Sequence, residues 1–156
     1  MEGISMKLAE ALQERADLNR RIEQLRYRLN NNVLMQEGEK PTEDPAVLLG
    51  ELSECFSRLE WLISRINLTN CAVKVEGSTL TELIARRDVL SLQAESYRRL
   101  VEEAGQNTHR ATRTEIKILP AVDVPALQRQ ADEASRALRL LDNTLQATNW
   151  TSDLLE

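Results

Sequence analysis

Apolar residues spaced alternately three and four positions apart recur along four stretches that fill most of this 156-residue chain. The four sets are Leu8, Leu18, Ile22, Leu25 and Leu29; Leu48, Leu52, Cys55, Leu59, Leu62 and Ile66; Leu80, Leu83, Leu90, Tyr97 and Val101; and Leu127, Ala131, Leu138, Leu141 and Leu145. This spacing places each set on one side of an α-helix, so four helices can bury their apolar stripes together. The predicted fold class is therefore all-α, an antiparallel four-helix bundle with long helices.

Capping signals predict where these helices begin and end. Asp44 can accept hydrogen bonds from the free N–H groups of a helix that begins at Pro45. Thr79 and Glu82 have the spacing of a capping box, and Gly105 can adopt the left-handed conformation that ends many helices. We therefore expect helices from Ser5 to Asn30, from Pro45 to Cys71 or Ala72, from Thr79 to Glu103 or Ala104, and from Val124 to Asn149.

One segment does not follow the helical spacing. Residues 112–119 alternate between polar and apolar, as a half-exposed strand does. Val33–Gln36 is the comparable run that would lie at the same end of an antiparallel bundle. The sequence therefore leaves two options, a small β-ribbon between these segments at one end of the bundle or an extended arm that contacts a partner.

Composition limits the class of protein. The length fits a single domain over residues 1–156. The net charge of −5 argues against sequence-independent binding to nucleic acid, whose affinity comes from neutralising phosphates. The chain shows no leader and no apolar run near 18 residues, so we expect a cytoplasmic protein with no membrane partner. Cys55 and Cys71 lie about 24 Å apart along one expected helix, too far to form a disulfide.

Polar residues interrupt the apolar stripes at one level of the expected bundle. Arg15 and Arg87 occupy stripe positions, and Asn67 and Asp142 lie on the flanks of their stripes at a similar height. Two converging arginines can hold an anionic ligand or a phosphate, which makes these four residues a candidate ligand-binding layer. The structural alternative is that the arginines fix the helix register, either by pairing with Glu14, Asp88 or Asp142 or by extending their charged ends outward into solvent.

A basic cluster is another candidate functional site. His109, Arg110, Arg113 and Lys117 form a basic cluster that could contact an anion, although Glu115 and Asp123 can pair with it. A lone histidine is a poor metal signal, and we expect no metal and no cofactor.

The carboxylate pairs Glu51/Glu54 and Glu14/Asp17 match the spacing found in all-α nucleotide pyrophosphohydrolases. They lie toward opposite halves of the expected bundle, and the sequence shows no catalytic residue pattern.

A second apolar surface lies away from the predicted core. Trp61 and Leu68 are seven residues apart, almost opposite the core stripe of their helix, and Ala85, Val89 and Leu92 lie similarly on the next helix. A monomeric bundle would leave these side chains in water. A stripe led by tryptophan on two consecutive helices therefore predicts contact with another chain through Trp61, Leu68, Val89 and Leu92.

Five stretches of the chain carry a resemblance: Met6–Leu25 (MKLAEALQERADLNRRIEQL), Arg65–Asn70 (RINLTN), Thr79–Leu90 (TLTELIARRDVL), Thr108–Lys117 and Leu141–Trp150 (LDNTLQATNW). They resemble a family of small, largely uncharacterised bacterial proteins that are often labelled septicolysin-like. The resemblance covers nearly the whole chain from Met6, so we expect Met1–Ser5 to be an N-terminal extension. The label implies a cholesterol-dependent pore-forming toxin, and the family supplies no catalytic residues.

The leading hypothesis is a cytoplasmic, non-enzymatic helical protein that forms a homo-oligomer or docks with a protein partner. The alternative is an anion- or nucleotide-binding protein, or a hydrolase, that uses the Arg15/Arg87 layer. The pore-forming role implied by the resemblance is the third hypothesis.

Overall fold

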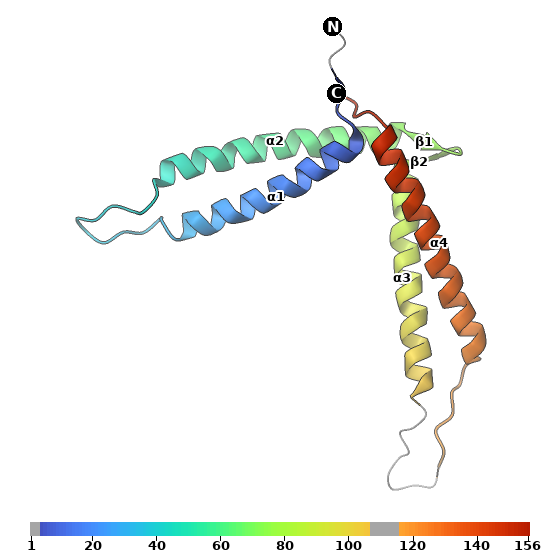
Figure 1. Cartoon of the computed structure of the whole chain (residues 1–156). Helices are drawn as coiled ribbons and strands as arrows, with labels where there is room; N and C mark the ends of the chain where they lie inside the picture. Colours follow the sequence, from blue (N-terminus) through green and yellow to red (C-terminus); the bar gives the residue numbers. More distant parts are fainter. Residues whose placement is uncertain (1–3, 107–115) are drawn as a thin grey trace. The chain divides into compact units, whose positions relative to one another are not determined.

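The computed structural model describes residues 4–106 and 116–156, which form four long helices and one small β-ribbon (Figure 1). The helices are α1 (Leu8–Asn30), α2 (Pro45–Ala72), α3 (Leu80–Gly105) and α4 (Val124–Thr151). The strands are β1 (Lys74–Val75) and β2 (Ser78–Thr79). The predicted all-α class, with long helices and a small ribbon, is confirmed.

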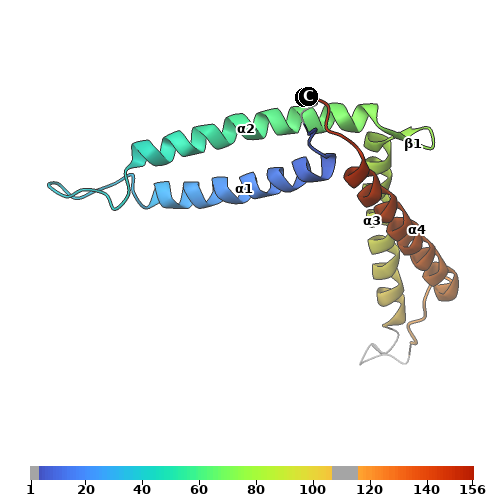
Figure 2. The same ribbon diagram turned by 45° about the horizontal axis from the view of Figure 1, so that its top comes forward.

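The chain divides into two compact units, each containing one pair of neighbouring helices. The first unit comprises Met1–Val75 and Thr148–Glu156, and the second comprises Glu76–Ala147. Helix α1 lies beside α2, and α3 lies beside α4, in both views of the chain (Figures 1 and 2). A single domain over residues 1–156 stays a prediction, since the cooperativity of unfolding decides it.

The helix starts follow the capping signals of the sequence. The Asp44 carboxylate accepts a hydrogen bond of 3.0 Å from the backbone N–H of Ala46, one residue after Pro45. The Thr79 hydroxyl accepts one of 3.2 Å from the N–H of Glu82, whose side chain accepts from the Thr79 N–H at 3.4 Å. These bonds satisfy N–H groups that would have no partner within the helix, which fixes where each helix begins.

The predicted role of Gly105 is wrong. Gly105 is the last residue of α3, and among the described glycines only Gly38 and Gly77 have a positive φ. The helix ends through a hydrogen bond of 3.3 Å from the N–H of Gln106 to the carbonyl of Glu103, a tightened last turn. A left-handed residue is therefore not needed at this end.

The β-ribbon forms at a place that the alternating pattern did not predict. Val33–Gln36 and residues 116–119 form no strand, and residues 112–115 lie outside the described part of the chain. The ribbon instead joins β1 and β2 through Glu76 and Gly77, whose φ angles are 51° and 86°. Two positive φ angles are what a two-residue hairpin turn requires, but glutamate rarely adopts one, so the sequence signal was weak.

The predicted stripes face the core in both units, with every named stripe residue buried or half-buried. In the first unit Ile22, Leu25, Leu29, Leu48 and Cys55 form one buried cluster, against which Leu18, Leu52 and Leu59 pack. The buried apolar residues of the second unit are Leu80, Leu83, Ala94, Ala131, Ala134 and Leu145. Cys55 and Cys71 are not joined by a disulfide.

The two ends of the described chain meet in the first unit. The backbone N–H of Leu8 donates to the carbonyl of Ser152 at 2.9 Å, and the N–H of Leu154 donates to the carbonyl of Met6 at 2.8 Å. Leu154 is buried, and the N–H of Leu155 donates to the hydroxyl of Thr69 at 2.9 Å. The segment that follows α4 is therefore held on the α1–α2 pair by backbone bonds and one buried leucine.

Candidate functional site

The four residues of the predicted ligand-binding layer lie two in each unit. Arg15 is half-buried on α1 and Asn67 is exposed on α2, while Arg87 and Asp142 lie on α3 and α4. Within the described residues no hydrogen bond or ion pair joins any two of these four. Arg87 lies 3.3 Å from the carboxylate of Asp88, one of the partners that the structural alternative named. The layer stays a prediction.

The structure describes only some of the other charged candidate residues. His109, Arg110 and Arg113 lie outside the described residues, while Lys117 is exposed and Asp123 caps α4 by accepting from the N–H of Ala126 at 3.1 Å. Three of the four carboxylates that matched the hydrolase spacing have arginine partners, since Asp17 pairs with Arg20, Glu14 with Arg58 and Glu51 with Arg21. In residues 4–106 and 116–156 no three metal-binding side chains gather.

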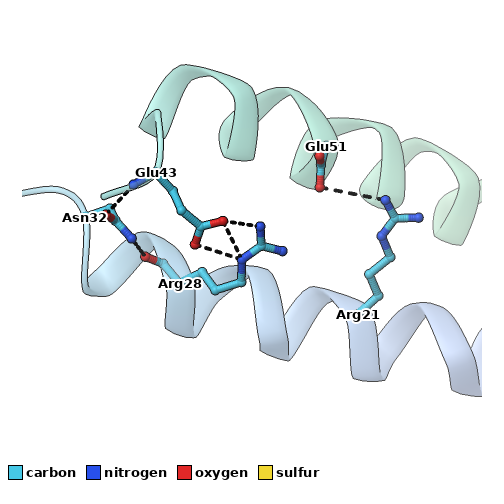
Figure 3. Close-up of polar contacts among 5 residues, drawn as sticks. All are labelled: Arg21, Arg28, Asn32, Glu43 and Glu51. Atoms are coloured by element: carbon cyan, nitrogen blue, oxygen red, sulfur yellow. Dashed lines mark hydrogen bonds and ion pairs between the residues drawn. The ribbon is translucent and has the colours of Figure 1, made fainter. Parts of the chain in front are cut away.

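A ladder of ion pairs joins α1 to α2 along one flank, and Figure 3 shows two of its members. Glu14, Arg21 and Arg28 are seven residues apart and so lie on one side of α1. Arg58 donates to both oxygens of Glu14, at 3.0 and 2.9 Å, and Arg21 lies 3.7 Å from Glu51. Arg28 binds both oxygens of Glu43, with its Nε 3.0 Å from Oε2. The ladder fixes the register of the two helices.

Hydrogen bonding in the ladder shifts the acidity of its members. The bond from Arg28 holds the pKa of the Glu43 carboxyl below its ordinary value and raises the pKa of Arg28. The bond to Glu14 likewise raises the pKa of Arg58. All three groups favour their charged forms, which suits a structural contact and offers no side chain poised to transfer a proton near neutral pH.

Asn32 closes the end of the α1–α2 pair beside this ladder (Figure 3). Its side-chain amide donates to the carbonyl of Arg28 at 2.8 Å, and its oxygen accepts from the N–H of Glu43 at 3.0 Å. The side chain is 7% exposed, so these bonds satisfy polar atoms that water reaches poorly. Asn32 therefore holds together the two ends of the segment that connects α1 to α2.

Trp61, the predicted anchor of an interface, lies between two arginines. The guanidinium carbon of Arg58 is 4.6 Å from the centre of the indole ring, and that of Arg65 is 5.9 Å away. Both distances fall within the range of cation–π contacts. The Nε atom of Arg65 is buried and has no hydrogen-bond partner among the described residues. Trp61 is thus half-buried in a polar setting, which its spacing from Arg58 and Arg65 could have indicated.

The other predicted interface residues are exposed. Leu68 on α2 is 50% exposed, and Val89 and Leu92 on α3 are 53% and 62% exposed. The apolar stripe that each helix buries leaves these side chains uncovered within their own unit. Whether they contact another chain stays a prediction.

The sequence of this chain corresponds to a recognised family. Residues 15–154 match the model of a family of unknown function, DUF6847, and the chain belongs to that family. Among proteins with curated descriptions, none is similar to this chain.

One solved structure shares the fold along nearly the whole length of the chain. It is the crystal structure of a functionally unknown conserved protein from Corynebacterium diphtheriae, with a TM-score of 0.91. The two sequences are 35% identical, and the match covers 97% of this chain and 99% of the other. The architecture is therefore shared by a relative whose function is likewise open.

Proposed function

We propose that this chain is a non-enzymatic helical module that works by associating with protein, in the first instance as a homo-oligomer in a reducing cytoplasm. The observation that carries the proposal is the exposure of Leu68, Val89 and Leu92, each at least half exposed on a helix whose inward stripe is already buried. Apolar side chains grouped on the outer face of a helix are typical of protein contacts. The described side chains offer no nucleophile and base that would favour an enzyme.

Light scattering over a range of concentrations tests this proposal. The wild-type chain should have the mass of an oligomer at micromolar concentration. Trp61→Glu should shift that mass toward the monomer while circular dichroism keeps its helical signal, because Trp61 lies outside the core. A wild-type monomer at high concentration, with no protein partner bound, contradicts the proposal. A Trp61→Glu chain that unfolds would show that the indole supports the fold.

A specific observation favours anion binding as the second candidate function. Arg15 is half-buried on α1 and has no carboxylate within ion-pair distance in the described part of the chain. A phosphate or nucleotide would supply a charged partner for this guanidinium. Inorganic phosphate and nucleotides should then raise the melting temperature of the wild type but not of Arg15→Met. Equal shifts in both chains would remove Arg15 from the site.

The pore-forming role implied by the label has no supporting observation among the described residues. None of their helices is long and apolar enough to cross a bilayer. Leakage of dye from cholesterol-containing vesicles tests this role directly, and we expect none.

A further inference from the structure

Helix α2 contains three four-residue repeats placed seven residues apart. They are Leu48–Glu51 (LLGE), Cys55–Arg58 (CFSR) and Leu62–Arg65 (LISR). The first residue of each repeat is buried in the core, and these three residues are only 2%, 4% and 0% exposed. The second residue is large and apolar, the third is small and the fourth is charged. Because residues seven apart share a helix face, the four positions form four stripes along α2.

The charged stripe already has its partners. Glu51 and Arg58 belong to the ladder with α1, and Arg65 lies against Trp61. This flank of the α1–α2 pair is therefore covered by polar contacts. The stripes on the other side of the core stripe have no such cover.

The large stripe, which consists of Leu49, Phe56 and Ile63, remains open. These side chains are 55%, 49% and 41% exposed, and Phe56 is the one phenylalanine of the chain. Residues one position apart lie about 100° apart around a helix, so a small stripe runs alongside, made of Gly50, Ser57 and Ser64. We call the two together the large–small face.

Helix α2 carries few charges for its length. The helix has five charged residues in 28 positions, against nine in the 23 positions of α1. Three of the five are Glu51, Arg58 and Arg65, in the charged stripe. Helical spacing places Glu60 on the large–small face, between its two stripes, and Glu54 at the edge of the small stripe. A depletion of charge with large apolar residues is typical of the centre of a protein contact.

No contact within its own chain explains why residue 50 is a glycine. It lies inside α2, where glycine is less favourable than alanine because it loses more backbone freedom on folding. A Cβ atom built at Gly50 would meet nothing within 4 Å. Its own unit therefore has room for a larger residue, whereas a helix packed closely from outside would not leave that room.

We propose that the occupant of this face is the α2 helix of a second copy of the chain, running antiparallel about a two-fold axis between Phe56 and Ser57. About that axis Phe56 meets Ser57 of the second copy, Leu49 meets Ser64, and Ile63 meets Gly50. Each large side chain thus faces a small one along the whole contact, and Gly50 acquires a reason to be glycine. The inference rests on the self-association that is proposed above, and it assigns that association to a face of α2 that does not include Val89 and Leu92.

The order of the repeat is what selects a second copy over an unrelated helix. A large residue followed by a small one, three times at a spacing of seven, is complementary to itself when the direction is reversed. Such an isologous contact uses the same patch on both subunits and closes as a dimer. The axis also brings Glu60 level with Ser53 of the second copy, whose hydroxyl can donate to that carboxylate.

The mass of the full chain and of three variants is the first test. The wild type should be dimeric or larger at micromolar concentration. Phe56→Glu should raise the dissociation constant of the dimer at least about 30-fold, since a central aromatic residue contributes strongly to an interface. Gly50→Gln should also dissociate the dimer while keeping or raising the melting temperature of the monomer. Leu140→Glu, at a residue of α4 that is 52% exposed, is the matched control and should leave the dimer intact.

Cross-linking locates the axis. In a Cys71→Ser background, Ser57→Cys should form a disulfide between two copies under mild oxidation, because the position lies next to the axis. Ser64→Cys, on the same stripe, should not cross-link to itself, since the two copies of residue 64 would lie about 22 Å apart. Association without the Ser57→Cys cross-link, or equal cross-linking at both positions, overturns this inference and leaves the proposed function standing. A monomeric wild type overturns both.

Discussion

The α1–α2 and α3–α4 pairs use the same heptad pattern but bury it to different extents. In the first unit the stripes contribute Leu8, Ile22, Leu25, Leu29, Leu48, Leu62 and Ile66 as buried residues. In the second unit three of the six buried apolar residues are alanines, and Leu90, Tyr97 and Val101 remain half-buried. Small side chains remove less apolar surface from water, so each helical turn of the second unit is stabilised less.

Polar contacts widen this difference. The first unit has two ion pairs between its helices, a third from α1 to the segment just before α2, and the backbone bonds that hold the chain ends together. The ion pairs described in the second unit, Arg87–Asp88 and Arg99–Glu95, both lie within α3. A shared sequence pattern therefore does not guarantee shared stability, and the α1–α2 pair should be the more stable of the two.

The largest expected effect comes from truncating one leucine of the apolar stripe in each pair. Leu25→Ala should lower the free energy of unfolding by about 2–5 kcal/mol, because Leu25 is only 1% exposed and a cavity would remain. Leu90→Ala should cost about 1 kcal/mol, because the half-buried Leu90 side chain loses less on truncation. Urea unfolding followed by circular dichroism measures both. Equal costs would break the comparison.

A smaller effect is expected where the C-terminal segment meets α2. Thr69→Val keeps the shape of the side chain but leaves the part-buried N–H of Leu155 without its acceptor, at a cost of about 1 kcal/mol. Thr144→Val is the matched control, because the Thr144 hydroxyl also donates to the carbonyl four residues earlier but is exposed. The control should stay within about 0.5 kcal/mol of the wild type. Similar losses in both variants would show that the segment adds nothing to the first unit.

Local signals explain how much of the fold was predictable. The starts of α2 and α3 could be read from Asp44-Pro45 and the Thr79/Glu82 box, because a cap depends on a few adjacent residues. The buried faces followed from heptad spacing alone. The ladder was missed, although charges at Glu14, Arg21 and Arg28 repeat every seven residues and could have indicated it.

Other features depend on information that spacing does not contain. A heptad stripe says which face of a helix is buried but not which helix covers it, so the division into two units could not be derived. The turn at Glu76 and Gly77 uses a glutamate where asparagine is usual, which hid the ribbon. The candidate site was likewise only partly predictable. Heptad spacing predicts the exposure of Val89 and Leu92, but it does not identify the arginines that lie around Trp61.

The smallest effect is a pH dependence confined to the ladder. The pKa of Glu43 is lowered in the folded chain, so its pair with Arg28 stabilises the fold above the ordinary pKa of glutamate. That contribution should be lost as the pH falls through the lowered pKa. Glu43→Gln should therefore melt slightly below the wild type at neutral pH and together with it in strong acid. A difference that grows toward low pH would contradict the role of the pair.

Amide hydrogen exchange, read by mass spectrometry at a concentration where the chain is monomeric, tests the difference between the helix pairs most directly. Slow exchange reports the free energy needed to open a region. The amides of α1 and α2 should exchange more slowly than those of α3 and α4, because their helices bury larger side chains and share the ion-pair ladder. Equal protection in all four helices would show one cooperative unit and would contradict the account.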